Sequence, residues 1–172
     1  MTLKPILSEE QIRNRIATLS ESIDKEFRGR NPLLLGVLKG SVHFLSDLSR
    51  SLSIPHEIDF IRVATYIEGT EASSQSRVEH FRSLNVKGRD ILVVDEILDQ
   101  GHTANAIKRF LLDQKPTNLE WVFLLVKEGA RQRTGLFPNY VGFEIGGNWV
   151  VGYGMDLNEA YRHLPGVYEL ET

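Results

Sequence analysis

Two adjacent acids end an aliphatic run between residues 91 and 104, which read ILVVDEILDQGHTA. Asp95 and Glu96 follow the four aliphatic residues directly, and Asp99 is a third acid four positions after Asp95. Ionised carboxylates are costly to bury unless a cation or a hydrogen-bonding group pairs with them. Acids at the end of a buried run therefore predict a site where a ligand or a cation meets the protein.

The loop that follows these acids suits a phosphate group. Ligands of open α/β sheets bind beyond the carboxyl ends of the strands, where loops enter helix N-termini. Backbone N–H groups between Asp99 and Thr103 can point at an anion there, and the nearby acids suit hydroxyl groups or a divalent cation. A sugar phosphate would satisfy both requirements. A helix cap or a solvated turn is an equally common use of adjacent acids after a strand, and spacing alone leaves that alternative open.

Motifs of the commonest nucleotide-binding folds are absent from the sequence. It contains neither GxxxxGK[ST] nor GxGxxG, which argues against a P-loop nucleotidase and a dinucleotide-binding enzyme. A two-component receiver domain also has an acidic pair after a strand. It needs a further Asp at the end of a later strand, however, and YVGFEI (140–145) offers none.

Length and composition bound the remaining classes. The 172 residues suit one domain, and the absence of cysteine excludes disulfides, zinc–thiolate sites and iron–sulfur clusters and favours a reducing, cytoplasmic location. The longest apolar runs have about six residues and Met1–Leu7 lacks the pattern of a signal peptide, so no membrane association is expected. A formal charge of −3 with scattered Lys and Arg argues against nucleic acid and favours a small-molecule partner.

Hydrophobic patterning predicts helices and strands that alternate along the chain. Ser8 and Gln11 have capping-box spacing, and the apolar residues after them recur at helical intervals: Ile12, Ile16, Leu19, Ile23 and Phe27. Two further helices are expected, one carrying Phe44, Leu45 and Leu48 and one beginning near Thr103. Strands are expected at 33–38, 56–66, 91–95, 119–126 and 140–145, with a further strand-rich stretch at 149–154. This alternation favours a parallel sheet with right-handed crossovers.

Residues 67–80, IEGTEASSQSRVEH, interrupt the pattern because they are polar and aperiodic. A loop of about this length in a compact domain is usually a lid, a binding loop or disordered. We expect a mobile lid over the site.

The stretch 91–104 resembles the signature with which type I phosphoribosyltransferases bind 5-phosphoribosyl-1-pyrophosphate (PRPP). GVLKGS (36–41), Thr65-Tyr66, LLVKEGAR (124–131) and YVGFEI…WVVGYGMD (140–156) extend the resemblance over most of the chain and narrow it to the hypoxanthine (guanine) phosphoribosyltransferases. The resemblance implies one α/β domain over residues 1–172, with a parallel sheet flanked by helices and a small hood lobe from the N- and C-terminal segments. It also implies purine salvage: hypoxanthine or guanine and PRPP would give IMP or GMP and pyrophosphate, with Mg²⁺.

The same resemblance assigns roles to individual residues. Asp99 would accept the proton of purine N7, Lys127 would bind the 6-oxo group, Trp149 would stack on the base and the main chain of Val150 would contact it. The residues implied for the ribose phosphate are Asp95, Glu96, Gln100, Gly101, His102 and Thr103. The residues implied for the metal are Asp95, Glu96 and Asp156. The residues implied for pyrophosphate are Lys39, Gly40 and Arg162, with a cis peptide between Leu38 and Lys39. Thr65 and Tyr66 would belong to the lid, and Arg131 matches a family Lys-x-x-x-Arg pattern.

Several positions depart from the family pattern. Asp95-Glu96 stands where Glu-Asp is more frequent, Gln100 replaces a usual Thr, and the residues before Trp149 lack the usual Pro and acid. A preference for xanthine, or a non-catalytic regulator of the same fold that binds PRPP or nucleotides, therefore remains an alternative. The retained Asp99 and Lys127 favour the enzyme, and relatives of this fold generally assemble as dimers or tetramers, so a homodimer or homotetramer is expected.

Overall fold

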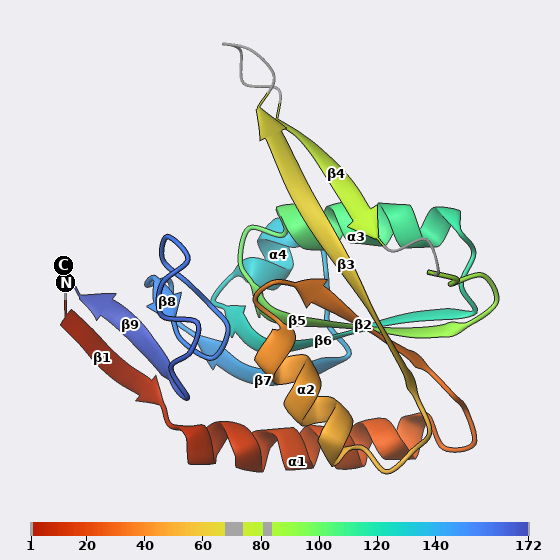
Figure 1. Cartoon of the computed structure of the whole chain (residues 1–172), viewed down its shortest axis with the longest axis horizontal. Helices are drawn as coiled ribbons and strands as arrows, with labels where there is room; N and C mark the ends of the chain where they lie inside the picture. Colours follow the sequence, from red (N-terminus) through yellow and green to blue (C-terminus); the bar gives the residue numbers. More distant parts are fainter. Residues whose placement is uncertain (1, 68–73, 81–83, 172) are drawn as a thin grey trace.

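The computed structural model describes residues 2–67, 74–80 and 84–171 (Figure 1). In chain order its elements are β1 (Thr2–Leu7), α1 (Glu9–Glu26), β2 (Leu33–Leu38), α2 (Val42–Ser51), β3 (Glu57–Ile67), β4 (Ser74–His80), β5 (Asp90–Leu98), α3 (His102–Asp113), β6 (Asn118–Lys127), α4 (Ala130–Thr134), β7 (Tyr140–Ile145), β8 (Val150–Val151) and β9 (Val167–Glu171). No helix of these described ranges is long and apolar enough to cross a membrane.

A six-stranded sheet forms the centre of the protein, with strand order β4-β3-β2-β5-β6-β7. Every neighbouring pair is parallel except β3 with β4. Figure 1 shows α1 and α2 on one face of the sheet and α3 and α4 on the other. The predicted parallel sheet flanked by helices is therefore confirmed.

Alternation of apolar residues along the strands explains this layering. Leu34 and Leu92 pack in one core with α1 and α2, whereas Leu33, Leu35 and Ile91 pack in a second core with α3 and α4. Side chains point to opposite faces at successive strand positions, so a continuous aliphatic run fills both cores. The runs LLLGVL and ILVV are apolar throughout for this reason.

Helix α1 follows directly from its local sequence. The Ser8 backbone N–H donates to Gln11 Oε1 at 2.8 Å and the Gln11 N–H donates to Ser8 Oγ at 3.2 Å, which confirms the predicted capping box. The five apolar positions predicted for its inner face, Ile12 to Phe27, are all buried. Helix α2 likewise buries the three residues predicted for it.

A second, three-stranded sheet has the order β1-β9-β8. Its strands come from both ends of the chain, and Figure 1 shows β1 and β9, the first and last strands, side by side. The sequence pattern did not predict β1 or β9. In the strand-rich stretch expected at 149–154, the structure has the two-residue strand β8. Pairing between β1 and β9 joins residues that are more than 150 positions apart, for example Thr2 with Glu171, so no local pattern announces it.

Two predictions about the central sheet were wrong. Residues 74–80 are not a loop, because they form β4 and pair antiparallel with β3. Val78 of β4 lies opposite Val63 of β3 and packs on the second core. Strand β5 does not end at Asp95 but continues to Leu98. Pairing with β6 extends it, since Ile97 and Leu98 lie opposite Leu125 and Val126. The rest of the predicted lid, 68–73, lies outside the described residues.

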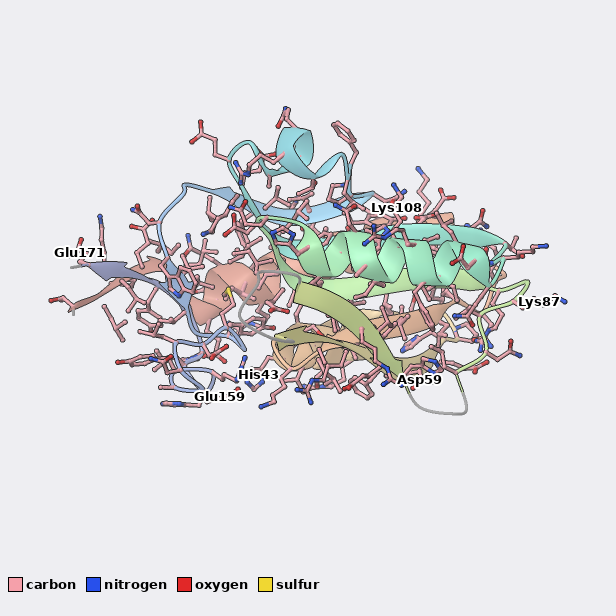
Figure 2. All side chains as sticks on the ribbon, turned by 90° about the horizontal axis from the view of Figure 1, so that it is seen from above. His43, Asp59, Lys87, Lys108, Glu159 and Glu171 are labelled. Carbon is pink, nitrogen blue, oxygen red and sulfur yellow. The ribbon has the colours of Figure 1, made fainter. Side chains whose placement is uncertain are left out.

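Basic and acidic side chains are interspersed around the protein, as Figure 2 shows. Exposed ion pairs such as Lys4 with Glu171 and Arg89 with Glu57 illustrate the mixture.

Candidate active site

The site residues gather where the winding of the central sheet reverses. β3 lies on one side of β2, whereas β5, β6 and β7 follow in order on the other side. The carboxyl ends of β2 and β5 therefore border a crevice, the usual ligand position in open α/β sheets. Two adjoining cavities of about 300 and 210 Å³ open there, and both are lined by Glu96 and Asp99.

The larger of these cavities contains every residue predicted to hold the ribose phosphate. Its lining includes Asp95, Glu96, Gln100, Gly101, His102 and Thr103. His102 and Thr103 begin α3, so their N–H groups belong to the helix N-terminus, which attracts anions. Gly101 lies against Thr134 of α4, with no room for a side chain between them. The loop is therefore held between two helices.

The adjacent acids are buried in the last part of β5. Asp95 is 5% exposed, and burial, with a further contribution from neighbouring Glu96, raises its pKa well above the usual value. Burial also raises the pKa of Glu96. Among the described residues Glu96 Oε2 has no hydrogen-bond partner. Asp95 Oδ1 accepts from the Glu96 N–H at 3.0 Å, so Glu96 Oε2 is the oxygen that a ligand, a cation or water can satisfy.

The carboxylates suit a Mg²⁺ ion that is held partly by the protein and partly by the substrate and water, and not a site built from protein ligands alone. Within the described ranges no three His, Cys, Asp or Glu side chains converge closely enough to hold a metal. Mg²⁺ usually takes one or two carboxylates together with waters and phosphate oxygens of the substrate. The orphaned oxygen of Glu96, with Asp156 acting electrostatically on it, is consistent with such an arrangement.

At the smaller cavity the proton acceptor and the base-binding lysine predicted from the sequence are in contact. Lys127, 7% exposed at the end of β6, places Nζ 2.9 Å from Asp99 Oδ2. The same ammonium group lies 5.8 Å from the ring centroid of Trp149. Trp149 is 59% exposed, Val150 beside it is buried, and both residues line the cavity. A planar base could lie against this ring with its polar edge toward Lys127 and Asp99.

The residues predicted for pyrophosphate are gathered beside Glu96. The peptide between Leu38 and Lys39 is cis. The family resemblance implies this form, but the sequence itself could not show it. A Cβ atom at Gly40 would overlap the Glu96 carboxylate, and one at Gly154 (φ 100°) would overlap the Gly40 carbonyl oxygen. Arg162 Nη1 donates to the Gly154 carbonyl at 2.7 Å. The backbone after β2 and the segment before β9 are therefore in direct contact.

Charged groups in this part of the site are paired with one another. Arg162 Nη2 lies 2.7 Å from Asp156 Oδ1 and 3.3 Å from Glu159 Oε2. Lys39 Nζ donates to both carboxylate oxygens of Glu159 at 3.1 Å. The hydrogen bonds from Lys39 and Arg162 lower the pKa of Glu159. Both cations predicted for pyrophosphate thus share one carboxylate.

Some predicted residues lie away from this cluster. Thr65 and Tyr66 are part of β3. Arg131 forms an ion pair with Glu144 of β7, with Nη1 to Oε1 at 2.7 Å. The pattern match at Arg131 therefore corresponds here to a contact between α4 and β7.

Sequence reasoning missed two residues that contact the site. Glu159 was not singled out, although it meets Lys39 and Arg162. Arg133 was not singled out either, and its Nη2 lies 3.4 Å from Asp99 Oδ1. A surface Glu and a surface Arg carry no distinguishing local signal. The partner Lys39 is 120 residues from Glu159, and Asp99 is 34 residues from Arg133.

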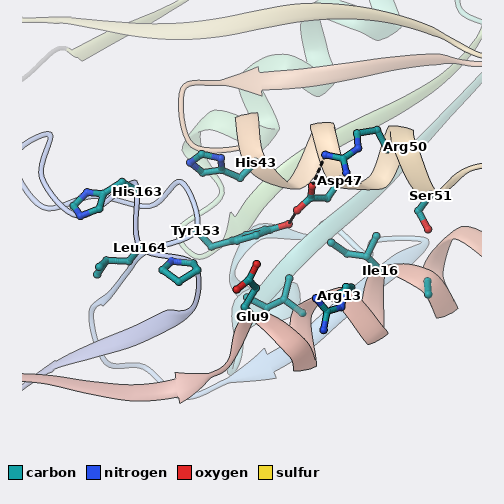
Figure 3. Close-up of a pocket in the computed structure, with 13 residues that line it drawn as sticks. Glu9, Arg13, Ile16, His43, Asp47, Arg50, Ser51, Tyr153, His163 and Leu164 are labelled. Carbon is teal, nitrogen blue, oxygen red and sulfur yellow. Dashed lines mark hydrogen bonds and ion pairs between the residues drawn. The ribbon is translucent and has the colours of Figure 1, made fainter.

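A third cavity, of about 550 Å³, lies outside this crevice, between α1, α2 and the segment before β9 (Figure 3). Tyr153 borders it and donates its hydroxyl to Asp47 Oδ2 of α2 at 2.6 Å. Its lining includes neither the acid pair Asp95-Glu96 nor the loop from Asp99 to Thr103. Its greater size therefore does not make it the candidate active site.

Comparison with known proteins agrees with this geometry. Residues 3–158 match the family model described as phosphoribosyl transferase domain. A hypoxanthine-guanine phosphoribosyltransferase of Lactococcus lactis is 41% identical over 162 residues, covering 94% of this chain and 87% of the relative. A hypoxanthine phosphoribosyltransferase of Escherichia coli is 32% identical over 166 residues, covering 95% of this chain and 93% of the relative.

Solved structures give the same result. A crystal structure of a hypoxanthine-guanine phosphoribosyltransferase from Bacillus anthracis aligns with a TM-score of 0.90 at 33% identity, covering 99% of this chain and 100% of the other. One of a hypoxanthine phosphoribosyltransferase from Staphylococcus aureus aligns with a TM-score of 0.89 at 34% identity, covering 98% and 91%. These matches over nearly the whole length establish that the chain belongs to the phosphoribosyl transferase family.

Proposed function

We propose that this protein is a purine salvage enzyme that makes IMP or GMP and pyrophosphate from hypoxanthine or guanine and PRPP. The relatives named above are hypoxanthine or hypoxanthine-guanine phosphoribosyltransferases over nearly their whole length. The observation that carries the proposal is the contact of Lys127 Nζ with Asp99 Oδ2 at 2.9 Å beside an exposed Trp149. A donor and an acceptor side by side match the 6-oxo group and N7 of one purine edge.

The reaction exchanges two bonds at the ribose anomeric carbon. Purine N9 forms a bond to C1′, the bond from C1′ to the pyrophosphate oxygen breaks, and pyrophosphate leaves with the bonding electrons. The N7 proton passes to Asp99, which acts as general base within hydrogen-bond reach of the ring. Lys127 donates to the 6-oxo group and stabilises the charge that develops there. Adenine has an amino donor at this position and would face the ammonium group unfavourably.

The ribose and phosphate groups occupy the neighbouring cavity in this proposal. The N–H groups at the start of α3 receive the 5′-phosphate, and Asp95 and Glu96 meet the ribose hydroxyls. Lys39 and Arg162 receive the pyrophosphate group. Asp95, Glu96 and Asp156 are the residues that would hold Mg²⁺, directly or through water, and neutralisation of pyrophosphate charge is the chemistry that the ion would supply when it is bound.

The first test is nucleotide formation from PRPP and Mg²⁺ with hypoxanthine, guanine, xanthine and adenine supplied separately. Turnover with hypoxanthine or guanine but not adenine supports the proposal. Preference for xanthine would change the assigned base, and binding of PRPP without turnover of any base would indicate a regulator.

Asp99→Asn tests the proton acceptor. Loss of the basic oxygen should lower turnover by about 10²-fold or more while the protein remains folded. Asp113→Asn, which makes the same change on the exposed end of α3, is the matched control and should retain normal turnover. Near-normal turnover of Asp99→Asn would remove Asp99 from this role.

A further inference from the structure

Helix α4 brings a second cation to the proposed proton acceptor. Arg133 Nη2 lies 3.4 Å from Asp99 Oδ1, on the opposite carboxylate oxygen from the one that Lys127 contacts. Gln100 Nε2 donates to the same Oδ1 at 3.1 Å. The two oxygens of Asp99 are therefore held from different sides, Oδ1 by Arg133 and Gln100 and Oδ2 by Lys127.

The guanidinium group of Arg133 is held by the backbone around it. Its Nη1 donates to the Glu128 carbonyl at 2.9 Å. The same Nη1 lies close to Gly129, where φ is 71°: a Cβ atom there would be 2.9 Å from it. Arginine presents several donors in a rigid planar fork, and fixing one arm orients the other. The arm that reaches Asp99 is thus placed before any ligand binds.

Helix α4 itself is fastened to the phosphate loop. Thr134 packs on Gly101, and Asn105 Nδ2 of α3 donates to the Thr134 carbonyl at 3.2 Å. Arg133 is the neighbour of Thr134 on this short helix. The position of Arg133 is consequently tied to the loop that carries Asp99.

Base binding changes the partners of the two oxygens differently. Lys127, Asp99 and Trp149 line the cavity proposed for the purine, whereas Arg133 does not. A bound 6-oxopurine would draw the Lys127 ammonium toward its carbonyl oxygen and free Asp99 Oδ2. Arg133 has no such competing ligand and would keep its contact with Oδ1.

We propose that Arg133 is a positioning residue for the transfer: it holds Asp99 Oδ1 so that Oδ2 faces N7 of the purine when Lys127 turns to the 6-oxo group. The inference rests on the proposed function and adds a residue to it. A nearby cation also weakens a carboxylate as a base, an effect that alone would make removal of Arg133 accelerate the proton transfer. Orientation should dominate, because misplacement by about 1 Å can cost up to about 10²-fold in rate.

The test compares Arg133→Gln and Arg133→Lys with the unaltered protein in single-turnover experiments with hypoxanthine and PRPP. Arg133→Gln should lower the rate constant by about 10-fold, while half-saturating PRPP and base change by less than about twofold. Arg133→Lys keeps the charge and should recover a substantial part of the rate. Arg109→Gln, which removes an exposed arginine from α3, is the charge-matched control and should behave as the unaltered protein. Thermal melting checks that each variant is folded, and Arg133→Met replaces Arg133→Gln if the latter does not fold.

The outcomes separate the two proposals. An unchanged or faster Arg133→Gln, an equal loss in Arg133→Lys, or a loss confined to half-saturating PRPP would overturn the role of Arg133 and leave the proposed function standing. No turnover by the unaltered protein would overturn both.

Discussion

The hydrogen bond between Tyr153 and Asp47 should stabilise the fold and the pyrophosphate end of the site together. Tyr153 is 6% exposed and directly precedes Gly154, which packs against the Gly40 carbonyl. Asp156 follows three residues after Tyr153. Its hydroxyl reaches Asp47 Oδ2 on α2, the helix that follows Lys39 and Gly40, as Figure 3 shows. Tyr153→Phe removes this link without changing the ring.

The structure sets the size of the expected effect. A hydrogen bond to a charged group contributes about 1.5–3 kcal/mol. The low end applies here, because Asp47 keeps its ion pair with Arg50 at 3.7 Å and borders a cavity of about 550 Å³ from which water can reach it. A loss of about 1.5 kcal/mol corresponds to a fall in Tm of about 3–6 °C for a chain of this size.

Urea unfolding of the unaltered protein, Tyr153→Phe, Asp47→Asn and the double variant measures the interaction as a double-mutant cycle. We expect a coupling free energy of about 1.5 kcal/mol and an increase in half-saturating PRPP for both single variants. A coupling free energy below about 0.5 kcal/mol would refute the assigned contribution, because effects of that size occur between independent sites.

The stabilisation by Tyr153 should also depend on pH. Burial, followed by the hydrogen bond to Asp47, raises the pKa of Tyr153 above its usual value. A raised pKa in the folded state means that the contribution is fully present below the unfolded pKa near 10 and is lost as pH rises toward the folded value. The free energy of unfolding of the unaltered protein should therefore approach that of Tyr153→Phe above about pH 10. A constant difference from pH 7 to 11 would contradict this reasoning.

Three further substitutions test the site. Asp95→Asn should unfold at a higher temperature than the unaltered protein in magnesium-free buffer, because it removes one of two adjacent buried acids, and should lose turnover; a lower Tm would contradict the cost assigned to burial. Glu159→Gln should lower half-saturating PRPP by about two- to fivefold in steady-state kinetics, because it frees Lys39 and Arg162 from a competing carboxylate; an increase would show that Glu159 assists binding. Lys127→Ala should raise half-saturating hypoxanthine far more than half-saturating PRPP, and equal losses would mean that the side chain is structural.

Local structure could be predicted from the sequence wherever one short segment contains all the residues that interact. The capping box of Ser8 and Gln11 and the periodic face of α1 depend on residues within a few turns of one helix, so both were predicted correctly. The order of strand, acids, loop and helix start was readable for the same reason, since one stretch of fourteen residues, 91–104, supplies all of them. That the loop binds a phosphate stays a prediction.

Elements that are stabilised by residues far away in the sequence could not be predicted in this way. β4 is a polar edge strand with Val78 as its apolar contact to the core, so its pairing with β3 supplies the ordering that its own pattern lacks. β5 continues past Asp95 because β6 lies beside it, which buries an acid that the pattern alone placed at a strand end. In each case backbone pairing outweighed local polarity.

The sequence by itself determined which residue types are available for chemistry and, through the hydrophobic alternation, which strands are covered on both faces. Tertiary structure decided which charges meet: Lys127 with Asp99, Arg133 with the other oxygen of Asp99, and Lys39 with Glu159. Coulombic and hydrogen-bonding interactions act over a few ångströms in space and are indifferent to separation along the chain. Only the folded protein therefore shows which charged residues are partners, because strand order and short helices bring them together. Periodic burial, in contrast, can be predicted from the types of neighbouring residues.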